Sequence, residues 1–157
     1  MKGMTIIVKN ISSWVKMLII LFGIYVTIFG HLTPGGGFAG GVILACSYIL
    51  LMLAFGKEYA EENLSLGITS KLDCAGALLF AAIALCGFIY GAAGFFLNFA
   101  YQKWQAGHDT ALRLVSAGTI PLSNIAICLK VGASLFMIVL LLSVFRCDFS
   151  SGEQEVS

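Results

Sequence analysis

Four long apolar runs dominate this sequence, with shorter polar stretches between them. A helix needs about 20 mostly apolar residues to cross the hydrocarbon core of a bilayer, where its backbone groups must be satisfied internally. Hydrophobic residues make up 59% of the 157 residues and charged residues only 11%, a balance that is not typical of soluble domains. The sequence therefore predicts an all-α membrane protein with four transmembrane helices, at about residues 14–31, 34–55, 72–99 and 121–145.

No shift in composition divides the chain, so we expect a single integral-membrane domain over residues 1–157 with short termini at 1–13 and 147–157. The first run is longer than the apolar core of a typical signal peptide, and no A-x-A-like cleavage site follows it. We therefore interpret this run as a retained helix. The third run is the longest and must tilt, kink or project beyond the lipid.

The distribution of Lys and Arg predicts the orientation of the helices. Four spans place both termini on the same side of the membrane. That side holds six cationic residues, and the other side holds two, Lys103 and Arg113. Because loops rich in Lys and Arg stay in the cytoplasm, both termini are expected to be cytoplasmic. The six residues are Lys2, Lys9, Lys16, Lys57, Lys71 and Arg146.

Few residue patterns in the chain suggest chemistry. The five cysteines show no C-x-x-C spacing and no histidine at ligand spacing, so we interpret them as small apolar side chains. Neither a nucleophile with its base nor a phosphate-binding loop is recognisable, and a net charge of +1 gives no reason to expect a nucleic-acid partner. We expect no catalytic site, no metal and no cofactor, and hence a chain that is not an enzyme by itself.

A glycine-rich stretch, "HLTPGGGFAGG" at residues 31–41, separates the first two apolar runs. Thr33 is suited to cap a helix, and Pro34 is suited to its first turn, where a missing N–H has no consequence. Glycines four residues apart leave one helix face bare, so that a neighbouring chain or a line of water can approach. A tight turn with a packing face explains the stretch without an ion. The glycines are Gly35, Gly36, Gly37, Gly40 and Gly41, and the third run repeats the device at Gly87, Gly91 and Gly94.

Three ionisable residues are candidates for an ion or proton path. Lys130 lies nine residues after Pro121, about 13 Å along a helix, and is expected near the middle of the bilayer. No acid of the chain is expected at the same depth, which leaves an ion path and a pair with a carboxylate of a neighbouring chain as alternatives. His31 can change charge near neutral pH, or can simply cap the turn. Asp73 is expected to begin a helix, where a capping role explains it better than an ion path.

Two stretches resemble a known family. The segment "GHLTPGGGFAGGVILA" at residues 30–45 is similar to the signature of the MnhB or MrpB family, whose members are small subunits of Mrp-type multisubunit Na+/H+ antiporters. The segment "GTIPLSNIAICLKVGASLFMIVLLL" at residues 118–142 resembles the last helix of the same family. Ala39 departs from the family pattern, in which a larger or amide side chain is frequent, so no side-chain role is expected there. With four spans and a matching length, the resemblance covers nearly the whole chain.

The resemblance implies a role that the residues alone do not reveal. Members are accessory subunits of a large assembly in the cell membrane that exchanges Na+ for H+. There they help form the ion path and hold larger subunits together. The homologous subunit also occurs in membrane-bound hydrogenases and in sulfane reductase-type complexes related to respiratory complex I, which makes such a host an alternative. A purely structural membrane subunit is a second alternative. The expected partners are the other subunits and the lipid bilayer, with Na+ and H+ as the transported ions.

Overall fold

The computed structural model describes residues 4–32, 34–91 and 118–155. These residues form helices and turns without a strand. Every helix except α3 is long and apolar enough to cross a membrane, so the predicted all-α fold with four spans is confirmed. The helices are α1 (Ile6–Ile28), α2 (Gly37–Phe55), α3 (Lys57–Asn63), α4 (Leu66–Gly91) and α6 (Ile120–Glu155).

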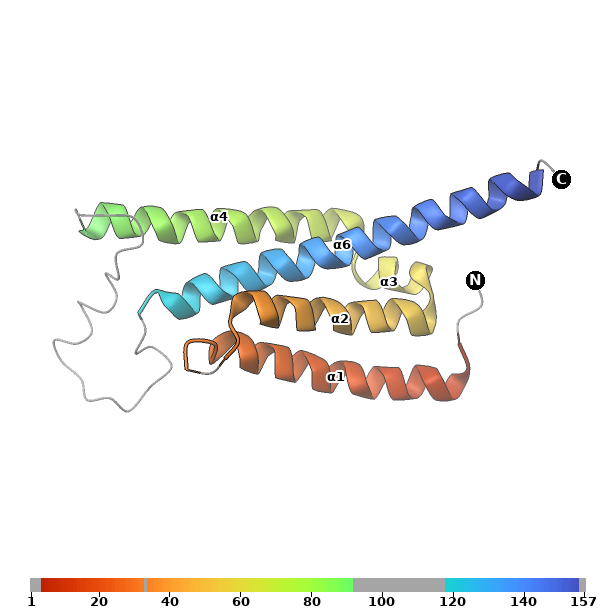
Figure 1. Ribbon diagram of the computed structural model, residues 1–157, viewed down its shortest axis with the longest axis horizontal. Helices are drawn as coiled ribbons and strands as arrows, with labels where there is room; N and C mark the ends of the chain where they lie inside the picture. The colour runs from red at the N-terminus through yellow and green to blue at the C-terminus, as the bar shows by residue number, and fades with distance from the viewer. Residues whose placement is uncertain (1–3, 33, 92–117, 156–157) are drawn as a thin grey trace.

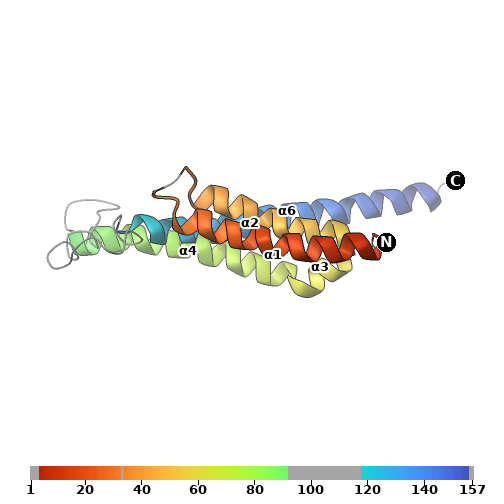
Figure 2. The ribbon, with the colours of Figure 1, turned by 90° about the horizontal axis from the view of Figure 1, so that it is seen from below.

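The four long helices lie side by side in the order α1, α2, α6, α4 (Figure 1). α2 packs on α1 and on α6, and α6 packs on α4, so α1 and α4 are the outer helices. α2 and α6 run in the same direction, and each is antiparallel to its outer neighbour. Figure 2 shows from a second direction that the C-terminal part of α6 extends past the other helices, while α4 extends at the opposite end. Because successive long helices along the chain alternate in direction, the start of α1 and the start of α4 lie at the same end of the bundle.

α1 begins at Ile6, about eight residues before the predicted start. Its first turns contain lysine, asparagine and serine, which lower the local hydropathy and conceal the beginning of the helix from a search for apolar runs. Most side chains of these turns, such as Ile6 and Ile7, are exposed, whereas Ser12 is only 7% exposed. The backbone N–H of Met4 donates to the carbonyl oxygen of Ala54 at 3.1 Å, which ties the N-terminus to the last turn of α2.

α2 begins at Gly37, so the prediction that Pro34 opens this helix is wrong. Gly36 has φ 125° and ψ −173°, a conformation that ends any helical path before Gly37 and that strongly favours glycine. Pro34 and Gly35 consequently belong to the turn between α1 and α2. Thr33, the predicted cap, lies outside the described residues.

A short helix that the apolar runs did not indicate, α3, follows α2 directly. Gly56, with φ 100°, separates the two helices. The ring of Tyr59 stacks on that of Phe55 with centroids 4.6 Å apart. Ala60 is buried in an apolar cluster that joins α2, α3 and α6, together with Met52, Phe136 and Leu140. This cluster closes the bundle at the end that carries the N-terminus.

α4 and α6 are both longer at one end than predicted. α4 begins at Leu66 instead of residue 72, and the backbone N–H of Ile68 donates to Oγ of Ser65 at 3.4 Å. The predicted end of this helix near residue 99 lies outside the described residues. α6 begins one residue before the predicted start and continues to Glu155 instead of residue 145. Its 36 residues correspond to about 54 Å, so it projects well beyond the apolar span at Ile120–Ser143.

Candidate functional site

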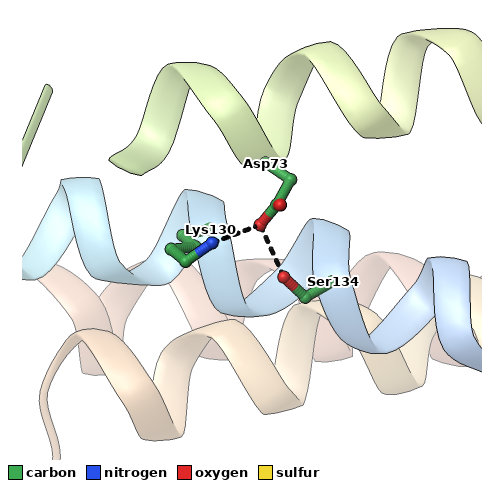
Figure 3. A network of polar contacts seen from close by, with 3 residues as sticks. All are labelled: Asp73, Lys130 and Ser134. Atoms are coloured by element: carbon green, nitrogen blue, oxygen red, sulfur yellow. Dashed lines mark hydrogen bonds and ion pairs between the residues drawn. The ribbon is translucent and has the colours of Figure 1, made fainter. Parts of the chain in front are cut away.

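An ion pair joins α4 to α6 within the candidate spans. Nζ of Lys130 donates to Oδ1 of Asp73 at 2.8 Å, and Oγ of Ser134 donates to the same oxygen at 2.5 Å (Figure 3). Across the four spans that the structure describes, Asp73 is the one acidic residue. The expectation that no acid lies at the depth of Lys130 is therefore wrong. We refer to Asp73, Lys130 and Ser134 as the ion-pair site.

The early start of α4 explains how the pair forms. Since α4 begins at Leu66, Asp73 is its eighth residue and lies two turns into the helix. It is thus too far from the helix start to act as the predicted cap. Lys130 is the eleventh residue of α6, which runs antiparallel to α4. This antiparallel packing brings the carboxylate and the ammonium to the same level.

A glycine on α4 lets the two helices approach closely at this point. A Cβ on Gly76 would lie 2.7 Å from the backbone nitrogen of Lys130, closer than real side chains come. Asp73 and Gly76 are three residues apart, and Lys130 and Ser134 are four apart, so each pair shares one face of its helix. Sequence reasoning missed both Gly76 and Ser134. Their spacing from Asp73 and Lys130 was the signal that could have identified them.

The ion-pair site is open toward the outside of the chain. The side chain of Lys130 is 47% exposed and that of Asp73 is 22% exposed. On translocon-insertion scales, a charged side chain at the centre of a membrane helix costs about 2.5–3.5 kcal/mol. The surface of α4 and α6 is therefore locally polar at a depth where a lipid-facing helix is expected to be apolar.

The first close contact of the glycine-rich stretch is between α2 and α1. A Cβ on Gly40 would collide with the hydroxyl of Thr27 and would lie 3.1 Å from the carbonyl oxygen of Gly23. The Thr27 hydroxyl donates to that carbonyl at 2.8 Å, and its oxygen lies 3.2 Å from Sγ of Cys128 on α6. Gly40 thus provides the space in which three helices meet.

The second close contact is between α2 and α6. A Cβ on Gly37 would collide with the backbone carbonyl of Asn124, and one on Gly41 would lie 2.9 Å from Cβ of Val131. A neighbouring chain or a line of water was expected along these glycines. The structure instead places α1 and α6 of the same chain against them, and the stretch acts as an internal packing face.

The remaining predicted residues lie apart from the ion-pair site. His31 occupies the turn after α1 and is partly exposed. On α4, Gly87 is buried and Gly91 is the last residue described, while Gly94 lies outside the described residues. Four cysteines in the described ranges are free thiols, and those ranges contain no group of three His, Cys, Asp or Glu residues that could hold a metal ion.

Comparison with known proteins matches residues 7–137 to the family described as "Domain related to MnhB subunit of Na+/H+ antiporter". A protein of Staphylococcus haemolyticus named "Putative antiporter subunit mnhB2" is 32% identical over 143 residues, which cover 91% of this chain and 97% of that protein. A protein of the same name from Staphylococcus aureus is 29% identical over 127 residues, covering 81% of this chain and 82% of that protein.

An uncharacterized protein of Methanocaldococcus jannaschii is 34% identical over 140 residues, covering 88% of this chain and 52% of that protein. The chain therefore spans about half of the Methanocaldococcus protein and nearly all of the S. haemolyticus one. The family match covers most of the chain and includes both Asp73 and Lys130. This chain belongs to the family of domains related to the MnhB subunit of Na+/H+ antiporters.

Proposed function

We propose that this chain is an accessory subunit of a multisubunit Na+/H+ antiporter, that it contributes the ion-pair site to the ion path, and that it holds larger subunits together. The names of its staphylococcal relatives support the assignment to an antiporter. The observation that carries the proposed role in the path is the partly exposed ion pair of Asp73 and Lys130 between two spans. Ionisable side chains inside a membrane are rare, and they commonly mark ion or proton pathways.

The composition of the site suits a monovalent cation or a proton. Asp73 offers a carboxylate and Ser134 a hydroxyl oxygen, and hard cations bind oxygen ligands of these kinds. The ammonium of Lys130 contacts the carboxylate oxygen of Asp73 that also accepts from Ser134. An arriving Na+ or H+ therefore competes with this ammonium for Asp73. In this proposal Lys130 balances the carboxylate while no ion is bound.

Removal of the chain tests the proposed function. Everted membrane vesicles from cells that lack the chain should lose the pH change that added Na+ produces, and re-expression should restore it. The purified chain alone in liposomes should move neither Na+ nor H+, because an accessory subunit needs its partners. Unchanged exchange in the vesicles that lack the chain would refute the antiporter role. Exchange by the chain alone would refute the accessory role.

We also propose that the chain lies in the cell membrane with both termini in the cytoplasm. In a variant without native cysteines, Ser157→Cys should react with an impermeant maleimide only when the cytoplasmic face is accessible. Leu32→Cys is a matched control, because Leu32 is 50% exposed in the turn at the opposite end of α1. It should react from outside intact cells. The reverse labelling pattern would contradict this orientation.

A further inference from the structure

α4 is the most weakly covered of the four spans. Buried residues make up 17% of its most apolar window, against 39% for α2. α4 packs chiefly on α6, and large apolar side chains such as Leu78 and Ile89 are at least 70% exposed. Apolar exposure of this kind suits lipid or another helix equally well. The choice between these two occupants depends on the charged group that interrupts the apolar surface.

The charge that the site presents outward is positive. Lys130 is the more exposed member of the pair, at 47% against 22% for Asp73. Asp73 receives both Lys130 and Ser134 on one oxygen, so its contacts are directed toward α6. The ammonium of Lys130 carries three donors, of which the contact with Asp73 uses one. The outer side of Lys130 can therefore donate further hydrogen bonds to a group beyond this chain.

Lys130 and Asp73 lie within the apolar spans, away from the lipid head groups. Lys130 is about 15 Å from the start of its span at Ile120 and about 20 Å from its end at Ser143, and Asp73 is about 10 Å from the start of its span at Leu66. The hydrocarbon core is about 30 Å thick, and phosphate groups lie at the surfaces of the bilayer. A protein segment that crosses the membrane can present an acceptor at the depth of the pair, so it fits the exposed ammonium better than a lipid head group does.

We infer that a membrane-spanning helix of another chain covers the surface of α4 and α6 around the ion-pair site and presents an Asp or Glu carboxylate to Lys130. Charge complementarity selects this partner, because a neutral apolar helix would leave the exposed ammonium facing hydrocarbon. Lys130 would then be shared by Asp73 and the carboxylate of the partner. The inference rests on the proposed function only in that it requires an assembly of several chains.

Photocrosslinking in the assembled complex tests which molecule covers Lys130. A photoreactive lysine analogue at position 130 should crosslink to a membrane-spanning segment of another chain that contains Asp or Glu. The same analogue at Lys16 is the matched control, because Nζ of Lys16 lies 5.0 Å from the ring centroid of Tyr48 in the same chain. It should crosslink mainly within the chain. Crosslinks from position 130 to lipid, or only to this chain, would overturn the inference.

Substitutions test whether the contact depends on charge. Lys130→Met should reduce the amount of partner chains that copurify by about ten-fold, and Lys130→Arg should retain most of them. If Lys130 serves Asp73 alone, the neutral double variant Asp73→Asn/Lys130→Met should restore copurification. We expect no such restoration until the crosslinked acid of the partner is also replaced by its amide. Full restoration by the double variant alone would refute the inference.

Because copurification is measured without transport, a complex that assembles normally but does not exchange ions would refute only the proposed function.

Discussion

Gly37→Ala is expected to destabilise the bundle by about 1–3 kcal/mol, as overpacking of a well-packed interior does. The added Cβ would collide with the backbone carbonyl of Asn124, and a backbone atom cannot move aside as the end of a flexible side chain can. The distance between α2 and α6 would have to increase along the whole contact. The measurement is the midpoint of thermal unfolding of the purified chain in detergent.

Gly67→Ala is the matched control for this prediction. Gly67 lies in the first turn of α4, where a Cβ would meet nothing within 4 Å. Alanine has the higher helix propensity, by about 1 kcal/mol in a helix interior, so this change should leave the midpoint unchanged or raise it. Equal midpoints for Gly37→Ala and Gly67→Ala would contradict the close packing of α2 on α6.

Asp73→Asn and Lys130→Met are expected to lower Na+-driven proton exchange by about ten-fold or more, because each breaks the ion pair between α4 and α6. Ser134→Ala should have a smaller effect, since it removes one hydrogen bond to Asp73 and leaves the ion pair in place. His31→Gln should retain much of the exchange, because His31 lies in the turn after α1 and not in the ion-pair site. The rates are measured as the pH change in everted vesicles after addition of Na+.

Hydropathy was sufficient to predict the four spans, but it did not predict where the helices begin and end. α1 and α4 start earlier than their apolar runs because a helix continues through polar residues whose backbone groups it still satisfies. α6 continues through the polar tail for the same reason. A membrane limits the apolar part of a helix, whereas the length of the helix itself also depends on caps and on glycines such as Gly56.

For the ion-pair site, the sequence predicted the charged residues but did not predict that they form a pair. Lys130 and Asp73 were each recognised as candidates because a charge within an apolar run is unusual. Their pairing was missed because it depends on the start of α4 and on the lateral order of the helices, in which α6 lies between α2 and α4. Neither property follows from the pattern of a single run.

The glycine-rich stretch illustrates the same limit. The spacing of its glycines indicated a bare helix face, and the structure shows close contacts there. Nothing in the spacing distinguishes a partner within the chain from a partner outside it. The contacts of Gly40 with α1 and of Gly37 with α6 depend on the three-dimensional arrangement of the helices.

The role of the ion-pair site in exchange is tested most directly by the exchange rate per assembled complex. Vesicles with unmodified chain, Asp73→Asn and His31→Gln are compared after the amount of complex in each has been determined by quantitative mass spectrometry of its subunits. We expect Asp73→Asn to reduce the rate per complex by about ten-fold or more and His31→Gln to leave most of it. An unchanged rate per complex for Asp73→Asn, or a loss confined to His31→Gln, would contradict a role of the Asp73–Lys130 pair in the ion path.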